Sequence, residues 1–436
     1  MNELVGILSE WNLWWSTGRV APELTGKKRE YTRDLIALIE PREVKILTGV
    51  RRGGKSTLFY QIIEWLLIEK GITPRQILLV NFEDEALAHF SLDEIFNAYQ
   101  SHLSPEGQVY LFLDEVQEKD RWEKWVRKKY DLKQAINFFA TSSSARLLSQ
   151  EYATLLTGRN VTSTIYPLGF REILQFSGIR VNDTDLVPQD MRNRISGLLF
   201  EYLKDGGFPE LIVHRQSMRR RLLNQYFQDI IYKDIVNRYG CHPGRIKDLA
   251  GYLMTNVSSL TSFRSLRGTF GFGLNTIGEY LSYLENAFLI YQLYFFDHSM
   301  KKQLVNPRKV YAIDNGLRNA VAFRFSQDMG RLMENAVFLE LKRHDREIYY
   351  WKDKRGKEVD FLVRKGMKIE SAIQVCANPE DDKTKKRELS ALNAAMHEFD
   401  LKEGIVITLD VRHELKDQGR KITFVPLWEW LLQQDM

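Results

Sequence analysis

Short apolar runs alternate with helical patterns between residues 41 and 175 of the chain. Turns or polar residues bound the runs, and the segments between them place apolar residues three or four positions apart. Strands that alternate with helices are typical of a parallel sheet covered by helices, so we expect an α/β domain here. The expected strands are Val44–Thr48, Gln76–Asn81, Val109–Leu113 and Asn137–Thr141.

Residues 176–300 show mostly helical spacing, for example in Arg220–Tyr239. Near the end of this stretch three short helical patterns are followed by an alternating, strand-like run. Three short helices followed by a hairpin are the outline of a winged helix. The expected helices are Ile246–Met254, Phe263–Phe270 and Leu274–Leu289, and the expected strand is Ile290–Phe296.

Strand patterns return in residues 301–436, which predict a second, mixed α/β domain. The expected strands are Val310–Ile313, Ile348–Trp351, Glu358–Val363, Ile369–Val375 and Gly404–Thr408, with helices Gly330–His344 and Lys383–Glu398. Residues 1–40 predict a helical N-terminal segment, in which Trp11, Trp14 and Trp15 share one apolar stripe. We therefore divide the chain into residues 1–40, 41–175, 176–300 and 301–436.

Composition adds few constraints. The 436 residues are 44% hydrophobic and carry a net charge of +5, which is ordinary for a globular protein. The charge permits a nucleic-acid partner without requiring one, although residues 300–387 hold 21 Lys and Arg against 13 Asp and Glu. We expect a soluble, cytoplasmic protein without a membrane span. The chain has only two cysteines, no basic segment before its first apolar residues and no long apolar run.

A phosphate-binding loop follows the first expected strand. Residues 49–56 match G-x-x-x-x-G-K-[ST] in full, and an amphipathic helix, Thr57–Lys70, comes next. Backbone N–H groups of such a loop surround phosphates, the lysine contacts the β- and γ-phosphates, and the serine hydroxyl binds Mg²⁺. We expect ATP and Mg²⁺ as cofactors. The expected nucleotide-binding residues are Gly49, Arg51, Arg52, Gly53, Gly54, Lys55, Ser56 and Thr57.

Two acids end the third expected strand. Asp114 is the expected second Mg²⁺ residue, and Glu115 is placed to act on the attacking water. Thr141 ends the next strand as a candidate sensor of the γ-phosphate, although a capping role in a Ser-rich turn is an alternative. Arg159 is a candidate for neutralising phosphate charge, in cis or from a neighbouring subunit, and a plain salt bridge is an equal alternative.

These motifs resemble the archaeal-type AAA ATPase family. The resemblance rests on Leu47–Ser56 and on Leu113-Asp-Glu-Val-Gln117, with further agreement in Asn81–Asp84, Gly158-Arg159, Pro167–Glu172 and Gly206–Glu210. The C-terminal part resembles the domain of unknown function that usually follows this ATPase, through Glu334-Asn335, Tyr350-Trp351, Glu358–Phe361 and Gln374-Val375. The resemblance implies a restriction-endonuclease-like fold for that domain.

Nucleases of this fold use acids to bind Mg²⁺ and a lysine to activate water. The resemblance places Glu334, Asp360 and Gln374 at the acidic positions and Cys376 at the lysine position. A thiol does not supply the positive charge of lysine, so we expect a structural or nucleic-acid-binding domain more than a nuclease. Lys352, Lys354 and Lys357 are candidate substitutes; the two cysteines show no zinc-site spacing.

The expected recognition helix of the winged helix begins at Leu274. Its outer positions Asn275, Thr276, Glu279 and Ser282 include no basic residue, whereas Arg245, Arg264 and Arg267 lie on neighbouring elements. A segment that packs against the ATPase is therefore an alternative to DNA binding.

The sequence thus predicts an Mg²⁺-dependent ATPase that couples its nucleotide state to DNA or partner binding. A nucleotide-dependent regulator of protein partners with an inactive nuclease-like domain is one alternative, and an ATP-regulated Mg²⁺ nuclease is another. Either is compatible with an oligomer.

Overall fold

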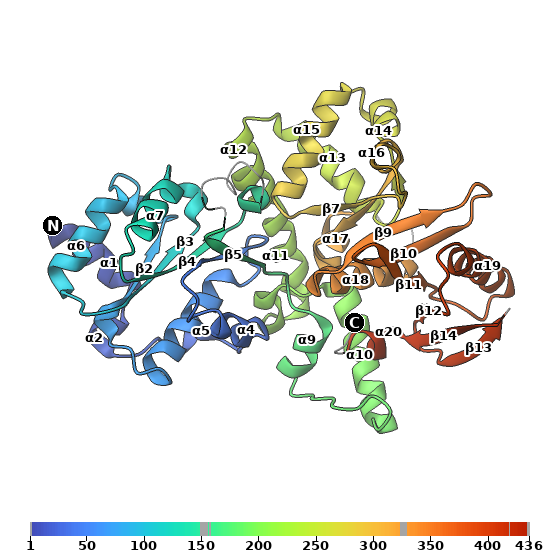
Figure 1. Ribbon diagram of the computed structural model, residues 1–436, viewed down its shortest axis with the longest axis horizontal. Coiled ribbons are helices and arrows are strands. Elements are labelled where there is room, and N and C mark those ends of the chain that lie inside the picture. The colour runs from blue at the N-terminus through green and yellow to red at the C-terminus, as the bar shows by residue number, and fades with distance from the viewer. Residues whose placement is uncertain (1, 149–155, 157, 323–328, 418, 434–436) are drawn as a thin grey trace. The chain divides into compact units, whose positions relative to one another are not determined.

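The computed structural model describes residues 2–148, 156, 158–322, 329–417 and 419–433. Residues 1–166, with the short stretch 286–288, form one compact unit, and residues 167–285 and 289–436 form the other. Figure 1 labels their helices and strands. The first unit ends at Tyr166, before the boundary expected at residue 175, and it includes the N-terminal segment that we separated at residue 40.

A five-stranded parallel sheet forms the centre of the first unit, in the order β2-β3-β4-β1-β5. The four strands predicted from apolar runs are confirmed. The fifth was missed because its sequence, Asn-Val-Thr-Ser-Thr, is polar and its side chains are only partly buried at the edge of the sheet. The strands are β1 (Val44–Thr48), β2 (Ile77–Asn81), β3 (Val109–Asp114), β4 (Ile136–Ser142) and β5 (Asn160–Thr164).

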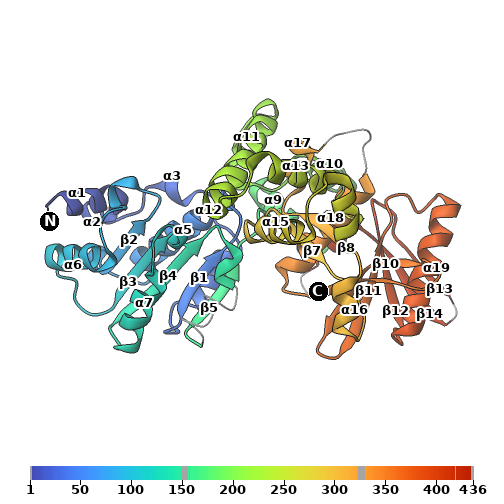
Figure 2. The ribbon, with the colours of Figure 1, turned by 90° about the horizontal axis from the view of Figure 1, so that it is seen from above.

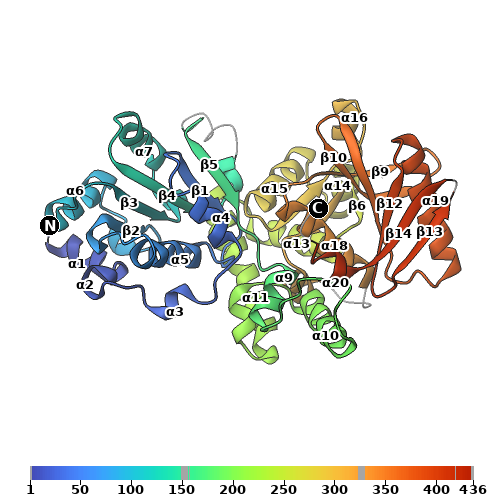
Figure 3. The same cartoon turned by 60° about the horizontal axis from the view of Figure 1, so that its bottom comes forward.

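Helices cover both faces of this sheet. One face packs on α1, α6 and α7, and the other packs on α5 and the short helices α2 and α4. Helix α3 contacts α5. Figures 2 and 3 show α5 and α7 on opposite sides of the strands. The helices are α1 (Asn2–Trp11), α2 (Trp14–Thr17), α3 (Pro22–Thr25), α4 (Tyr31–Ala37), α5 (Lys55–Ile68), α6 (Leu92–Leu103) and α7 (Trp122–Asp131), with 3-10 turns at Pro74–Gln76, Glu85–Leu87, Val116–Glu118 and Ala145–Leu148.

The N-terminal tryptophans pack into this unit. Trp14 is buried, and the indole N–H groups of Trp14 and Trp15 both donate to the backbone oxygen of Ile77 at the start of β2. The indole N–H of Trp11 donates to Asp84. The tryptophans do pack into this unit, but the expected single helical stripe is wrong, because α1 ends at Trp11 and α2 begins at Trp14.

The second unit begins with helices. They are α9 (Phe170–Phe176), α10 (Gln189–Asp205), α11 (Gln216–Asp229), α12 (Asn237–Tyr239), α13 (Pro243–Thr255), α14 (Phe263–Phe270), α15 (Leu274–Asn286), α16 (Met300–Val305) and α17 (Asn315–Val321), with a 3-10 turn at Pro209–Val213. Between α11 and α12 a π-helix, Ile230–Val236, continues the helical course that the sequence predicted over 220–239.

A small antiparallel sheet accompanies helices α13 to α15. Its order is β6-β8-β7, with β6 (Leu260–Thr261), β7 (Ile290–Leu293) and β8 (Arg308–Ala312). The boundary expected at residue 300 therefore lies between two strands that pair. The sequence analysis assigned β8 to the C-terminal domain. It did so because α16 separates β8 from β7 in the sequence, and the pattern of residues did not show which strand β8 pairs with.

A six-stranded mixed sheet follows, in the order β13-β14-β12-β11-β10-β9. Helix α19 packs its buried face on β10, β11 and β12, whereas α18 contacts β8 and β11. The polar edge strand β13 and the strand β14 were missed from the sequence. The elements are β9 (Glu347–Lys352), β10 (Glu358–Lys365), β11 (Lys368–Val375), β12 (Glu403–Thr408), β13 (His413–Asp417) and β14 (Arg420–Pro426), with α18 (Met329–Arg343), α19 (Asp382–Glu398) and α20 (Leu427–Trp430).

Among the described residues, no helix is both long enough and apolar enough to span a membrane.

Candidate functional site

The loop between β1 and α5 has the backbone that a phosphate-binding loop requires. Gly54 has a φ of +95° and stands directly before the first residue of α5. Gly49 has a φ of +149°, and a Cβ there would lie 2.2 Å from the backbone oxygen of Ile165. Glycine is needed at both positions, because a side chain would strain the backbone at each and would also collide with a neighbouring strand end at Gly49.

Lys55 and Ser56 open α5 and face the two acids at the end of β3. The Lys55 ammonium lies 3.2 Å from Oε1 of Glu115 and also donates to the backbone oxygens of Gly49 and Val50. The Ser56 hydroxyl lies near the carboxylate of Asp114 and lowers the pKa of that carboxyl group. The structure thus brings the predicted lysine, serine and both acids together at the carboxyl edge of the sheet.

Thr141, at the end of β4, joins the two acids. Its hydroxyl donates to Oδ1 of Asp114 and accepts the backbone N–H of Glu115 at 2.8 Å. Oε2 of Glu115 accepts the backbone N–H of Ser143 at 3.0 Å and the side-chain N–H of Gln117 at 2.5 Å. Thr141 therefore fixes the acids in place, a contact that neither of its predicted roles included.

The backbone at Glu115 is unusual, because its φ of +54° lies in the left-handed region that non-glycine residues seldom adopt. Such strain tends to occur where a side chain must be aimed for function. Gln117 hydrogen-bonds to Glu115, and the sequence analysis assigned it no role in the site. Its Oε1 is buried without a hydrogen-bond partner among the described residues, while its Nε2 holds Glu115.

The two acids have opposite pKa shifts. Burial, with the neighbouring charge of Glu115, raises the pKa of Asp114 to about 6. Burial also raises the pKa of Glu115, but the Lys55 ammonium, the Gln117 amide and Arg51 together outweigh it and lower that pKa to about 2. Glu115 is therefore ionised at neutral pH and held by the lysine that a phosphate would contact.

The remaining predicted residues fall in two places. Gly53 and Thr57 lie in the loop and the first turn of α5, and Arg51 pairs with Glu83 at 2.5 Å. Arg52 has a φ of +63° in the same loop. Arg159 lies at the opposite edge of the sheet, because it precedes β5, where its side chain pairs with Asp131 at 2.9 Å. A role for Arg159 in cis does not fit this position; a role from a neighbouring copy stays a prediction.

One buried arginine that supports the loop was missed from the sequence. Arg29 donates through Nη1 to the backbone oxygen of Gly53 at 2.8 Å and through Nη2 to that of Tyr166 at 3.0 Å. It is only 4% exposed. Since it lies in the charged run Lys27-Lys28-Arg29-Glu30, its pattern matches a solvated surface, and no local signal distinguishes it.

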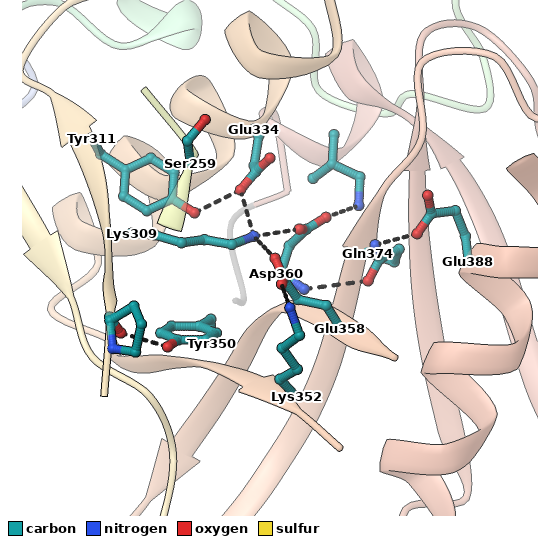
Figure 4. Close-up of polar contacts among 12 residues, drawn as sticks. Ser259, Lys309, Tyr311, Glu334, Tyr350, Lys352, Glu358, Asp360, Gln374 and Glu388 are labelled. Carbon is teal, nitrogen blue, oxygen red and sulfur yellow. Dashed lines mark hydrogen bonds and ion pairs between the residues drawn. The ribbon is translucent and has the colours of Figure 1, made fainter. Parts of the chain in front are cut away.

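In the second unit the predicted acidic residues also lie together, but around a lysine (Figure 4). The Lys309 ammonium lies 3.1 Å from Glu334 on α18 and 2.8 Å from Asp360 on β10. Gln374 accepts the backbone N–H of Asp360 at 3.2 Å and donates to Glu388. Cys376 is buried, and burial raises its pKa to about 11, so it does not supply a charge.

The lysines considered from the sequence take other positions. Lys352 pairs with Glu358 at 3.3 Å, Lys354 is exposed, and Lys357 donates to the backbone oxygen of Ser390. Lys309 was missed because it belongs to a different strand from the motif. Within the described ranges, no group of His, Cys, Asp and Glu side chains is arranged to hold a metal ion.

On the helices next to the small sheet, Arg264 and Arg267 are exposed on α14. On α15 the side chains of Asn275, Glu279 and Ser282 are exposed, and that of Thr276 is half-buried. Arg245 is exposed on α13, where its guanidinium lies over the ring of Phe272. The basic residues of this region therefore lie mainly beside the expected recognition helix.

Comparison with known proteins divides the chain in a similar way. The model of an AAA domain matches residues 41–174, and two domains of unknown function, DUF8612 and DUF4143, match residues 196–328 and 329–430. The DUF8612 match includes both β7 and β8, in agreement with the pairing of these two strands.

Two relatives cover almost the whole chain. The uncharacterized protein MJ1544 of Methanocaldococcus jannaschii is 32% identical over 94% of this chain and 93% of its own length. An uncharacterized protein of Haemophilus influenzae is 30% identical over 93% of this chain and 98% of its own.

Solved structures of lower similarity include the Walker-type ATPase PABY2304 of Pyrococcus abyssi, at 14% identity and a TM-score of 0.42 over 70% of this chain and 97% of that one. Another is DnaA of Aquifex aeolicus bound to AMPPCP, at 16% identity and a TM-score of 0.26 over 59% and 86%. The domain match, the full-length relatives and the loop and acids described above agree, and the chain belongs to the AAA family of P-loop ATPases.

Proposed function

We propose that this chain is an Mg²⁺-dependent ATPase whose nucleotide state controls binding of DNA or of a protein partner. The observation that carries the proposal is the cluster of Lys55, Ser56, Asp114 and Glu115 at one edge of a parallel sheet, in which Lys55 pairs with Glu115. A lysine and a serine that follow a glycine loop, and that face two acids at the end of β3, are the side chains that phosphoryl transfer to water requires.

The residues present fit a magnesium ion bound with the nucleotide. Ser56 and Asp114 offer a hydroxyl and a carboxylate oxygen, which are the hard ligands that Mg²⁺ prefers. When bound, Mg²⁺ supplies positive charge to the β- and γ-phosphate oxygens. Thr141 keeps Asp114 in the position that this role needs.

Glu115 is the proposed residue that polarises the attacking water. It is ionised, and its Oε2 is oriented by Ser143 and Gln117. Its Oε1 is held by Lys55, so the lysine has to leave Glu115 as it turns to the phosphates. Nucleotide binding would therefore release the catalytic carboxylate at the same moment that it supplies the substrate.

The proposed DNA-binding part is the segment from α13 to β8. Its order of helix, strand, two helices and two strands, with the short helix α16 between the last two strands, resembles that of a winged helix. Arg264 and Arg267 give α14 an exposed basic edge. These arginines are suited to phosphate contacts, whereas the neutral and acidic residues of α15 are poorly suited to them. A protein partner is the alternative occupant of this surface.

The decisive experiment measures ATP hydrolysis with Mg²⁺ alone, with duplex DNA and with single-stranded DNA. DNA should raise the rate of the wild type, and an Arg264→Ala/Arg267→Ala variant should lose the stimulation. The matched control removes two exposed arginines from α11, Arg220 and Arg221. Hydrolysis that DNA does not change would favour the protein partner, and hydrolysis that survives Glu115→Gln would refute the proposed role of Glu115.

A further inference from the structure

Lys309 is anchored on the middle strand of a sheet. Its backbone pairs with Leu260 of β6 on one side and with Leu293 of β7 on the other. The side chain is 2% exposed and passes from this sheet to the acidic residues of the C-terminal domain. Because both neighbouring strands hold β8, the lysine cannot leave the acids through a simple loop movement.

The ammonium group is fully occupied by carboxylates. Its nitrogen lies 2.8 Å from Asp360, 3.0 Å from Glu358 and 3.1 Å from Glu334 (Figure 4). An ammonium group has three N–H donors, so each donor can be matched to a different carboxylate. Lys352 brings a second positive charge to Glu358 at 3.3 Å.

The oxygen atoms that a metal ion would use are already hydrogen-bonded. Oδ2 of Asp360 accepts the backbone N–H of Val375 at 3.0 Å, and Oε1 of Glu334 accepts the Tyr311 hydroxyl at 2.7 Å. Oε1 of Gln374 accepts the backbone N–H of Asp360. Mg²⁺ needs several free oxygens around one point, and here that point is occupied by nitrogen. The magnesium ion implied by the nuclease-like resemblance therefore does not fit these residues.

We propose that the Lys309 ammonium is a built-in cation that takes the place of the metal ion in the Glu334–Glu358–Asp360 cluster. The C-terminal domain then keeps the acidic residues of a nuclease without metal-dependent cleavage. In this arrangement the lysine also joins the small sheet to the C-terminal domain. The proposal concerns this cluster alone and does not depend on ATP hydrolysis.

The test compares the full-length wild type with Lys309→Met, without nucleotide, by titration with Mn²⁺. Methionine keeps the length of the side chain and removes its charge, so the three carboxylates lose their cation. Lys354→Met is the matched control, because it removes the charge of an exposed lysine of the same domain. The double variant Lys309→Met/Asp360→Asn shows whether any Mn²⁺ site gained by Lys309→Met includes Asp360.

We expect Lys309→Met to have lower thermal stability than the wild type and to bind Mn²⁺ at least about tenfold more tightly than the wild type does. Mn²⁺ should restore part of the stability, and Asp360→Asn should abolish the gain. A folded Lys309→Met protein that gains no Mn²⁺ binding would overturn the proposal.

The wild type gives an independent test in case Lys309→Met does not fold. We expect the wild type to show no Mn²⁺ binding that Asp360→Asn removes, and no cleavage of duplex or single-stranded DNA that depends on Asp360. Either of these activities would overturn the proposal, because the lysine would then act beside a metal ion and not in its place.

Discussion

Replacing Glu115 with glutamine should tighten ATP binding while it slows hydrolysis. The Lys55 ammonium, which is 3% exposed, lies 3.2 Å from Glu115. A phosphate group must draw the lysine away from that carboxylate. Glutamine can still accept a hydrogen bond from Lys55, but it no longer competes with the phosphate as a charge.

The size of the effect follows from the strength of this ion pair. Two unit charges at 3.2 Å attract by about 5 kcal/mol at an effective dielectric constant of about 20, before desolvation is subtracted. The pKa of Glu115, lowered to about 2 from 4.5, corresponds to a net gain of about 3 kcal/mol that remains after the cost of burial is subtracted from the effect of its partners. Lys55 accounts for part of that energy, so we expect ATP to bind about 10- to 100-fold more tightly to Glu115→Gln.

The same energy should be missing from the nucleotide-free variant. Glu115→Gln should therefore lower the thermal stability of the protein without nucleotide, and saturating Mg²⁺-ATP should raise that stability by more than it does in the wild type. Loss of the residue that polarises water should lower kcat by about 10²- to 10⁴-fold. Glu85→Gln is the control, because it removes the same charge from an exposed residue of the same unit.

Two measurements are needed to test the reasoning: the ATP dissociation constant and the stability without nucleotide. Tighter binding alone would also follow if Glu115 merely repels the γ-phosphate. The ion pair predicts tighter binding together with a less stable nucleotide-free form. A variant as stable as the wild type without nucleotide would refute the competition between Glu115 and phosphate for Lys55.

Three further predictions concern residues around the site and in the second unit. Arg29→Met should weaken ATP binding about tenfold with little change in kcat, because it removes the hydrogen bond to Gly53; an unchanged dissociation constant would contradict the support role. Gln117→Ala should lower kcat about tenfold with ATP affinity near the wild-type value, since Glu115 loses its side-chain donor; steady-state kinetics test this, and a change in KM alone would contradict it. Burial raises the pKa of Asp314 to about 6 from 3.8, so its carboxyl group holds a proton in the folded state that the unfolded state loses. Stability of the wild type relative to Asp314→Asn should therefore fall by about 3 kcal/mol as pH rises from about 4 to about 6, and parallel melting curves across that range would refute the burial argument.

The nucleotide site was largely predictable because its signals are local. Gly49 to Ser56 are contiguous, and Asp114 and Glu115 directly follow an apolar run. Parallel strands place their carboxyl ends at one edge of a sheet, so the loop and the acids had to meet. Arg29 was not predictable in this way, because it acts through hydrogen bonds to the backbone oxygens of Gly53 and Tyr166, which are distant from it in sequence.

Two of the strands missed from the sequence share a physical cause. β5 and β13 are polar edge strands without an alternating apolar pattern. β14 is different, because Ile422 and Phe424 alternate on its buried face and it pairs with a strand on each side. Edge strands need hydrogen bonds from one neighbour and little apolar surface, which makes them hard to distinguish from loops. The boundary at residue 300 has another cause: β7 and β8 were both expected as strands, but α16 lies between them in the sequence, so nothing local showed that they pair.

Lys309 shows where a motif comparison within one domain fails. The comparison assigned the missing positive charge to position 376, because nuclease-like domains supply it from the strand that holds Gln374. The charge comes instead from β8, a strand that pairs with β6 and β7 and lies outside the motif. Buried carboxylates require a positive charge beside them, but that charge can come from any strand that reaches them. The buried acids of such a domain should therefore be matched to a cation from the whole fold before the site is judged active or inactive.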